Sequence, residues 1–283
     1  MIKKLSDQLI YSNTKLEDVL KLMNNSFSEG LLFIVDKETR LLGSISDGDV
    51  RRSLLYENIS KNSVVNDVME KNPKKVFINK IDLHQIIKFR EEGYKKIPIV
   101  NKHGLIVEII NFSKTKTKLP VDVLIMAGGE GKRLRPLTTN IPKPLLKIND
   151  VPIIKRVIDH ISNYGIKKFF VSIGYLGNKI SSYLNELIDF KFDFLKEETP
   201  LGTIGSASMI KRFYHDDILV TNADILTEVD FEDFFLFHKN SKADITILSI
   251  PYNVKIPFGI LNTSNGKLKS IKEKPTYSYL TNG

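Results

Sequence analysis

A glycine-rich and basic segment follows an apolar run in the middle of the chain, and its residue types suit the binding of phosphate groups. Residues 123–126 are all apolar, as in a strand that is buried on both faces. Gly128, Gly129 and Gly131 follow, and Lys132 comes directly after them. Glycine leaves backbone amides free to approach an anion, and neighbouring cations neutralise its charge. The segment therefore predicts a loop that holds a triphosphate.

Two commoner glycine motifs do not fit this loop. A Walker loop would carry Ser or Thr after its Gly-Lys pair, but Arg133 follows Lys132, and Met126 occupies the position of the first glycine. A dinucleotide-binding fingerprint would need glycine or alanine where Leu134 stands. A simple turn with incidental basic residues is the structural alternative. We disfavour it because motif matches of this length rarely arise by chance.

The pattern that remains is long enough to compare with known families. It reads GGxGxRLxPLT over residues 128–138, followed by PKPLL over residues 142–146. This pattern resembles the signature of the sugar-phosphate nucleotidyltransferases, also called nucleotide-sugar pyrophosphorylases. The resemblance implies that a sugar-1-phosphate oxygen attacks the α-phosphorus of a nucleoside triphosphate while pyrophosphate leaves. It also implies Mg²⁺ as the cofactor.

The resemblance assigns chemical roles to three candidate catalytic residues. Arg133 matches the loop arginine that binds the triphosphate, and Lys143 matches the lysine that neutralises the reacting phosphates. Asp224 comes shortly after the apolar run at residues 218–221 and matches the strand-terminal aspartate that binds the metal. The structural alternatives are a salt bridge for Lys143 and a turn cap for Asp224. Asp230 is expected to be only a helix N-cap.

Later segments resemble the family's substrate-binding elements in the same order. EETPLGTIGSA over residues 197–207 resembles the substrate loop, although its glycines could simply turn the chain. By resemblance, Glu273 accepts sugar hydroxyls and Lys274 pairs with the sugar phosphate. The resemblance places the nucleotide at Leu124, Ala127, Gly128, Gly129, Gly131, Lys132, Arg133, Lys143, Gly202 and Thr203. It places the sugar phosphate at Gly259, Glu273, Lys274 and Asn282.

The elements that would position these residues alternate between strands and helices. Apolar runs typical of buried strands alternate with helical apolar spacing from residue 121 onward. Such alternation predicts an α/β fold with a doubly wound, mixed but mostly parallel, Rossmann-like sheet, whose ligands lie beyond the carboxyl ends of the strands. We expect strands at 121–126, 168–173, 192–195, 218–221 and 244–250, and helices at 151–164, 179–187, 204–213 and 231–238.

The N-terminal part contains a weak internal repeat. Helical spacing at residues 16–23 and 83–89 is followed in each copy by an apolar run, at 31–35 and 97–100, and by a turn. Each copy is too small for a stable core, so the pair should bury a shared one. The segments FIVDKETRLLGSISDGDV and PIVNKHGLIVEII resemble a tandem pair of cystathionine-beta-synthase (CBS) domains, which have an α+β fold.

This second resemblance implies one candidate ligand site. In CBS domains a Ser or Thr and an Asp three residues later often bind the ribose of an adenine nucleotide, and Ser46 and Asp49 match that pattern. The second copy departs from it, with Ile109 and Asn111 near the corresponding place. The structural alternative, which we weigh above ligand binding, is that residues 47–49 turn the chain and cap the following helix.

Length and composition fit a globular protein with more than one domain. The chain has 283 residues, of which 42% are hydrophobic and 27% are charged. Its lack of cysteine excludes disulfides, thiolate metal sites and thiol catalysis. We expect a CBS pair over residues 1–112, divided into 1–62 and 63–112, then a linker over 113–118 and a transferase part over 119–283.

Charge and hydropathy exclude some classes of binding partner. The net charge is +9, but the lysines are scattered and there is no tryptophan, which disfavours nucleic-acid binding. No apolar run approaches the length of about 20 residues that a membrane span needs. We therefore expect a cytoplasmic homo-oligomer without nucleic-acid or membrane partners. Its ligands would be a nucleoside triphosphate, a sugar-1-phosphate and, at the CBS pair, an adenine nucleotide.

The order of the modules suggests a more specific role. It resembles bacterial transferases for surface or flagellar glycans, including the glucosamine-1-phosphate guanylyltransferases of legionaminic acid synthesis, so we expect GTP and glucosamine-1-phosphate. Relatives carry a second metal-binding aspartate. After Asp224 no candidate for it stands at the expected place, and we therefore expect a truncated C-terminus rather than a naturally short form. The alternative function is a nucleotide-sensing regulatory subunit with a catalytically incomplete transferase fold.

Overall fold

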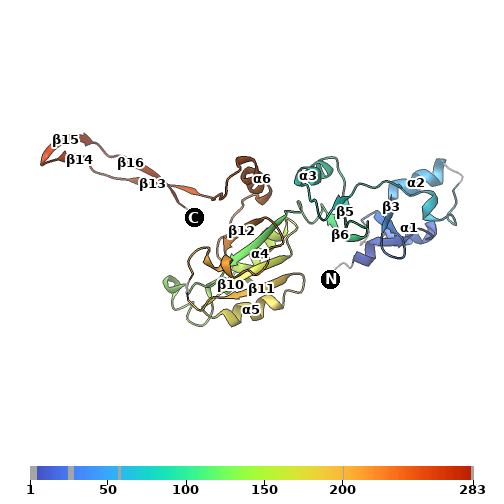
Figure 1. Ribbon diagram of the computed structural model, residues 1–283, viewed down its shortest axis with the longest axis horizontal. Helices are drawn as coiled ribbons and strands as arrows, with labels where there is room; N and C mark the ends of the chain where they lie inside the picture. The colour runs from blue at the N-terminus through green and yellow to red at the C-terminus, as the bar shows by residue number, and fades with distance from the viewer. Residues whose placement is uncertain (1–4, 25–28, 57–58, 200, 282–283) are drawn as a thin grey trace. The chain divides into compact units, whose positions relative to one another are not determined.

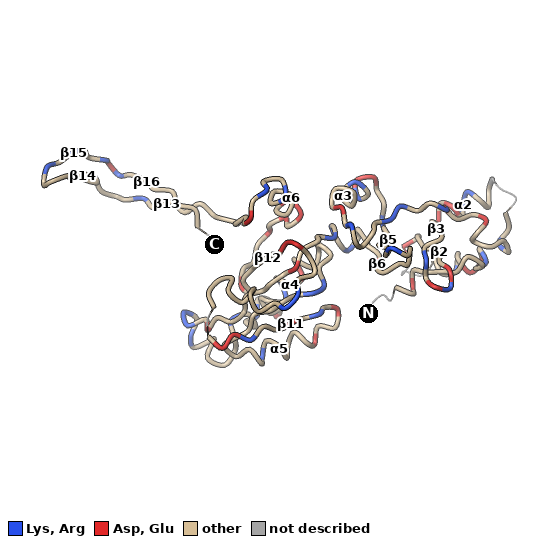
Figure 2. Tube along the Cα trace, viewed as in Figure 1, with Lys and Arg blue, Asp and Glu red and all other residues tan. Residues whose placement is uncertain are grey.

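The structure is a computed structural model that describes residues 5–24, 29–56, 59–199 and 201–281 (Figure 1). It divides into two compact units, Met1–Glu232 and Asp233–Gly283. Lys and Arg residues occur along the whole chain, as Figure 2 shows, in agreement with the scattered charge of the sequence. No helix in these ranges combines the length and the apolar character that crossing a bilayer requires.

The N-terminal part of the first unit contains the same small sheet twice (Figure 1). In each copy the first two strands are parallel and the last two are antiparallel. The strands are β1 (Leu9–Tyr11), β2 (Leu31–Val35) and β3 (Leu41–Ser46) in the first copy, and β4 (Val76–Phe77), β5 (Lys96–Val100) and β6 (Ile106–Asn111) in the second. The helices are α1 (Leu16–Asn24), α2 (Asp47–Tyr56) and α3 (Leu83–Glu91). The copies thus share one topology, as the internal repeat predicts.

A shared apolar core joins the two copies. Phe33 and Val35 on β2 pack in one buried cluster with Val100 on β5 and Ile106 on β6. All four side chains are almost inaccessible to solvent. Neither copy alone could bury them, because each supplies only part of the cluster.

The second part of the first unit is built on a parallel sheet of four strands. Their order is β11 (Lys191–Lys196), β10 (Lys168–Ile173), β7 (Val121–Met126) and β12 (Asp217–Asn222). Every neighbouring pair is parallel, so all four carboxyl ends lie at one edge. The helices between the strands are α4 (Ile153–Ser162) and α5 (Gly177–Asn185). This arrangement confirms the predicted doubly wound sheet.

Burial explains why the sequence forms these elements. Val123, Leu124 and Ile125 on the central strand β7 are fully buried, as their continuous apolar run predicts. On α4 the buried residues are Ile154, Val157, Ile158 and Ile161, which keep helical spacing along one face. This helix begins at Ile153 rather than at residue 151, because β9 (Val151–Pro152) pairs with β8 (Lys147–Ile148).

Two predicted elements were wrong. Residues 204–213 form only a short 3-10 helix, Gly205–Met209, because glycine and serine favour helix poorly and the chain turns tightly there. A Cβ at Gly205 would lie only 2.7 Å from the Leu201 Cβ. The strand predicted at 244–250 is instead β13 (Ile250–Lys255), since its partner β16 (Thr276–Thr281) lies opposite those residues.

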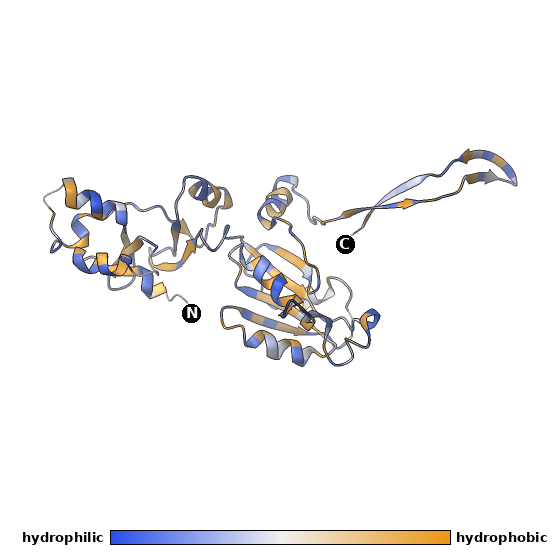
Figure 3. Ribbon diagram, turned by 180° about the vertical axis from the view of Figure 1, so that it is seen from behind, coloured by the Kyte–Doolittle hydropathy of each residue, from blue (hydrophilic) through white to orange (hydrophobic). Residues whose placement is uncertain are grey.

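The second unit consists of the greater part of α6 (Phe231–Ser241) and a long antiparallel ribbon. In this ribbon β13 pairs with β16, and β14 (Ile260–Ser264) pairs with β15 (Lys267–Lys272). Figure 3 shows hydrophobic and hydrophilic stretches following one another along it. Most of its side chains are exposed, because two strands alone bury little apolar surface.

An ion-pair cluster connects the second copy of the repeat to the parallel-sheet part of the first unit. Arg90 on α3 donates two hydrogen bonds to the Glu232 carboxylate, at 2.8 and 2.9 Å. The Glu232 side chain is only 4% exposed and that of Arg90 is 26% exposed. The hydrogen bonds to Glu232 raise the pKa of the Arg90 guanidinium above its ordinary value. Lys116, in the predicted linker, pairs with Asp230 and lies 3.8 Å from the Glu232 carboxylate.

Candidate active site

The glycine loop lies at the carboxyl end of the central strand β7. The Ala127 amide, which directly follows this strand, donates to the Ser172 carbonyl at 2.9 Å and so remains bonded to β10. Beyond it the chain leaves the sheet. The backbone amides of residues 128–131 donate to no other described residue. Successive free amides at a strand end are suited to binding an anion.

Close backbone contacts explain why this loop needs glycine. A Cβ at Gly174, which follows β10, would lie 2.9 Å from the Gly128 carbonyl oxygen. The Tyr175 amide donates to that same oxygen at 3.2 Å. Gly131 has a left-handed φ of 61°, and a Cβ there would lie 3.2 Å from the Lys143 Cβ. The loop therefore lies directly against the segment that carries Lys143.

Lys143 and Asp224 form an ion pair beside the loop. Lys143 starts the 3-10 helix Lys143–Leu145, between two buried prolines. Asp224 comes shortly after β12, whose last residue pairs with Met126 at the end of β7. The two side chains are 37% and 27% exposed, so a ligand can reach the pair. The sequence assigned these residues separately to the phosphates and the metal, and the structure brings them into contact.

Three further cations lie on the loop. Lys132 and Arg135 each approach the Glu130 carboxylate at 3.3 Å. Arg133 lies between them on the 3-10 helix Lys132–Leu134, and its side chain is exposed. It forms no ion pair with any residue of the described ranges. Arg133 is therefore free to bind a phosphate group.

The predicted substrate loop lies at the same edge of the sheet. The Ser206 hydroxyl lies 3.2 Å from the Met126 sulfur at the end of β7. Gly202 has a left-handed φ of 79°, and it and Thr203 are exposed. Leu124 differs from the other predicted nucleotide contacts, because it is fully buried in β7 and its side chain belongs to the core.

The predicted sugar-phosphate residues that the structure describes lie in the second unit. Gly259 precedes β14 and Glu273 follows β15. A Cβ at Gly259 would lie 2.9 Å from a Glu273 carboxylate oxygen, so these two residues are neighbours. Lys274 has a left-handed φ of 40°, and Asn282 lies outside the described residues. Contact of this group with the sugar phosphate stays a prediction.

Asp224 is the carboxylate of the site that could hold a metal ion. No group of three or more His, Asp or Glu side chains that could hold a metal occurs in the part of the chain that the structure describes. Mg²⁺ is often bound by only one or two carboxylates, with phosphate oxygens and water completing its shell. Asp224, beside the glycine loop, fits that mode of binding.

Sequence reasoning missed Ser172 and included Glu197 only as the first residue of the predicted substrate loop, and both residues lie at this edge. Ser172 is on β10, and its hydroxyl donates a short hydrogen bond to the Glu197 carboxylate. Glu197 directly follows β11, and its carboxylate also accepts the Leu201 amide at 3.2 Å. Its place at the carboxyl end of a parallel strand is the signal that could have identified it.

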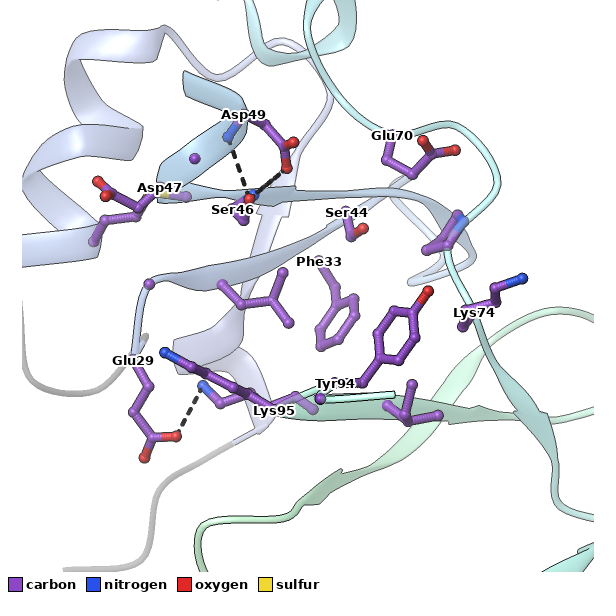
Figure 4. A pocket seen from close by; sticks show the side chains of 18 of the residues that line it. Glu29, Phe33, Ser44, Ser46, Asp47, Asp49, Glu70, Lys74, Tyr94 and Lys95 are labelled. Carbon is purple, nitrogen blue, oxygen red and sulfur yellow. Dashed lines mark hydrogen bonds and ion pairs between the residues drawn. The ribbon is translucent and has the colours of Figure 1, made fainter. Parts of the chain in front are cut away.

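The candidate CBS site contains a helix cap and a cavity. The Ser46 hydroxyl donates to the Asp49 carboxylate at 2.7 Å, and the Asp49 amide donates back to that hydroxyl at 3.2 Å. These bonds cap α2, as the structural alternative predicts. Ser46 and Asp49 also line a cavity of about 670 Å³, together with Tyr94 and Lys95 of the second copy (Figure 4). Ser46 and Asp49 can therefore cap α2 and also face a ligand in the cavity.

The parallel sheet and the free amides at its carboxyl edge define a nucleotide-binding α/β domain. The model of the nucleotidyl transferase family matches residues 122–282, and that of the CBS domain matches residues 8–56. The chain therefore belongs to the nucleotidyl transferase family and carries a CBS domain ahead of its transferase part.

Several curated proteins are similar to the transferase part. The bifunctional protein GlmU of Methanococcus maripaludis strain C5 is 33% identical over 162 residues, which are 57% of this chain and 37% of that protein. The mannose-1-phosphate guanyltransferase beta-A of Xenopus laevis is 27% identical over 160 residues, or 54% of this chain and 44% of that protein. This chain thus spans less than half the length of these two relatives.

A shorter relative is covered more completely. The D-glycero-alpha-D-manno-heptose 1-phosphate guanylyltransferase of Aneurinibacillus thermoaerophilus is 28% identical over 160 residues, which are 56% of this chain and 70% of that protein. Among solved structures, HddC from Yersinia pseudotuberculosis is 27% identical, with a TM-score of 0.44 over 57% of this chain and 73% of that one.

Proposed function

We propose that this protein is a sugar-1-phosphate nucleotidyltransferase, which joins a hexose-1-phosphate to a nucleoside triphosphate and releases pyrophosphate. The observation that carries the proposal is the edge of the sheet at β7 and β12. There the free amides of residues 128–131 lie with the exposed Arg133 and the Lys143–Asp224 pair. Free amides, cations and one carboxylate are the groups that this reaction needs.

The chemistry follows from these groups. An oxygen of the sugar-1-phosphate forms a bond to the α-phosphorus, the bond from that phosphorus to the bridging oxygen breaks, and pyrophosphate leaves. The amides orient the triphosphate, while Arg133 and Lys143 neutralise the charge that develops on the leaving group. We propose Mg²⁺ as the cofactor, held by Asp224, where it would supply further charge neutralisation on the phosphate oxygens.

For the substrates we propose GTP and glucosamine-1-phosphate, used in the synthesis of bacterial surface or flagellar glycans. Guanylyltransferases among the similar proteins support GTP. The order of the modules supports the aminohexose. We also propose that the protein is cytoplasmic and that it forms a homo-oligomer. Light scattering on the purified chain would test the oligomeric state.

Pyrophosphate release is the direct test. GTP, ATP, UTP and CTP would each be combined with glucosamine-1-phosphate, N-acetylglucosamine-1-phosphate and mannose-1-phosphate. We expect the fastest release from GTP with glucosamine-1-phosphate. If another combination of nucleoside triphosphate and sugar-1-phosphate gives the fastest release, that combination replaces GTP and glucosamine-1-phosphate as the proposed substrates. Nucleotide binding without release from any pair would favour the alternative, a nucleotide-sensing regulatory subunit.

The cavity of the CBS pair supports a second function, the binding of an adenine nucleotide as a regulator. Its volume of about 670 Å³ is in the range of small-molecule sites. Ser46 and Asp49 offer acceptors for ribose hydroxyls, and Lys74 and Lys95, which also line the cavity, supply charge for phosphates (Figure 4). We propose that this nucleotide controls the transferase part.

Calorimetry with AMP, ADP and ATP on the intact protein tests this site. Asp49→Asn keeps an acceptor for the α2 cap but removes the charge, so we expect binding to weaken by about tenfold, the value of one charge-assisted hydrogen bond. The charge-matched control is Asp18→Asn, on the exposed side of α1, which should bind as the wild type does. If the wild type gives no heat, Ser46 and Asp49 have only the capping role.

A further inference from the structure

A buried threonine closes the stretch of the loop that carries Arg133. Thr138 is the last residue of the GGxGxRLxPLT pattern and is inaccessible to solvent. Its hydroxyl donates to the Gly131 carbonyl at 2.9 Å. A Cβ built on Gly131 would lie 3.2 Å from the Thr138 Cγ2, so the two residues also pack closely. Thr138 thus joins the two ends of residues 131–138, which include Lys132 and Arg133.

A tyrosine that follows β10 contacts the loop at both of its ends. The Tyr175 amide donates to the Gly128 carbonyl, at the start of the loop, at 3.2 Å. The Tyr175 hydroxyl lies 2.9 Å from the Thr139 carbonyl oxygen and 3.2 Å from that of Thr138. A phenol has a single O–H donor, so the two carbonyls share it. Tyr175 therefore connects the first glycine of the loop to the residues where the loop closes.

The turn that carries Tyr175 is fixed to the sheet and to α5. It lies between α5 and β10, the strand next to the central strand. The Gly177 amide, at the start of α5, donates to the Gly174 carbonyl at 3.0 Å. Lys179 of α5 donates to the Asn140 carbonyl at 2.6 Å. Donors from this turn and from α5 therefore hold the returning half of the loop.

These contacts fix the direction of two backbone amides. In a planar trans peptide the carbonyl and the following N–H point in opposite directions. The Gly128 carbonyl shares its peptide plane with the Gly129 amide, and the Gly131 carbonyl shares its plane with the Lys132 amide. Because hydrogen bonds hold both carbonyls, both amides point away from those bonds. The Gly129 amide, which donates to no other described residue, is thereby oriented before a ligand arrives.

We propose that Tyr175 and Thr138 are positioning residues, whose hydroxyls hold the glycine loop in its phosphate-binding conformation; this rests on the proposed function of the same site. They act through the loop backbone and through the position of Arg133, and they need not touch the ligand. Without these hydroxyls only a fraction of the molecules has the loop in that conformation, and the apparent affinity for a triphosphate falls by that fraction.

Tyr175→Phe removes one of the two hydroxyls and keeps the ring. We expect the affinity for inorganic tripolyphosphate with Mg²⁺, measured by calorimetry, to fall about fivefold, the value of one hydrogen bond. In pyrophosphate release the loss should lie in KM for the triphosphate, with kcat nearly unchanged, because the bound triphosphate orders the loop. Tyr183→Phe is the matched control, since Tyr183 on α5 is also half-buried and its hydroxyl forms no hydrogen bond with any residue of the described ranges.

Thr138→Val and Thr138→Ser test the second hydroxyl. Valine keeps almost the same shape but leaves the Gly131 carbonyl with only the Leu134 amide, so we expect a similar fivefold loss of affinity. Serine keeps the hydroxyl and should restore most of it. Amide hydrogen exchange in residues 128–139 of the ligand-free protein should be faster in Tyr175→Phe and Thr138→Val than in the wild type, and unchanged in Tyr183→Phe.

Binding of tripolyphosphate requires no turnover, which separates this inference from the proposed function. Weaker binding in Tyr175→Phe and Thr138→Val, with folded proteins at the assay temperature and recovery in Thr138→Ser, supports the inference even if the wild type releases no pyrophosphate and the proposed function fails. Wild-type affinity in either variant overturns it. So does a loss mainly in kcat, a loss that Thr138→Ser does not recover, or a wild type that binds no tripolyphosphate.

Discussion

Asp224→Asn is expected to abolish metal-dependent pyrophosphate release while the fold persists. Asparagine keeps the shape of the side chain but removes the charge that would hold the metal ion beside the phosphates. Loss of one group that stabilises charge at a reaction centre costs about 10²- to 10³-fold in rate, and we expect at least that loss in kcat/KM. The measurement is pyrophosphate release as a function of Mg²⁺ concentration.

Stability separates this effect from unfolding. The Lys143–Asp224 pair is partly exposed, so its loss should cost no more than about 1 kcal/mol. Glu228→Gln provides the control, because Glu228 lies on the same segment after β12, is exposed and undergoes the same change of charge. An Asp224→Asn protein with wild-type activity would refute the assignment of Asp224 as the metal ligand.

Arg90→Met is expected to produce the largest loss of stability among the substitutions considered. It leaves Glu232, which is 4% exposed, without its bidentate partner. Breaking a buried pair typically costs about 3–5 kcal/mol, and Lys116, 3.8 Å from Glu232, should compensate part of the charge. We therefore expect a loss of about 2 kcal/mol or more in the free energy of unfolding, measured by urea denaturation.

A second cation provides the comparison for this result. Arg51 is 73% exposed and pairs with Asp47 along α2, so Arg51→Met should cost only about 0.3–0.5 kcal/mol. Combining Arg90→Met with Glu232→Leu removes the unpaired charge and should restore part of the loss. Equal losses in the free energy of unfolding for Arg90→Met and Arg51→Met would show that the Arg90–Glu232 pair contributes little to stability in solution.

The edge of the sheet that carries the glycine loop could be predicted from the sequence because its signals are local. The apolar run at residues 123–126 indicates a buried strand, and the glycine spacing after it indicates the loop. Since parallel strands end at one edge, the aspartate after β12 had to lie near that loop. The structure places Asp224 there, in contact with Lys143.

Features that depend on distant partners could not be predicted in this way. Arg90 and Glu232 are 142 residues apart in the sequence, and Ser172 and Glu197 are 25 apart. No local pattern relates either pair. The strand predicted at 244–250 was wrong for the same reason, because pairing with β16 decides which residues form the strand.

The Arg90–Glu232 pair also determines where this chain could be cut for module exchange. A chimaera joined within the predicted linker after Lys116 would keep Asp230 and Glu232 but lose Arg90 and the Lys116 ammonium that pair with them. Two carboxylates would then share one surface without their cations. A chimaera joined ahead of α3 would carry both cations with the transferase part. Arg90 thus ties α3 of the second copy to the transferase part, upstream of the predicted linker.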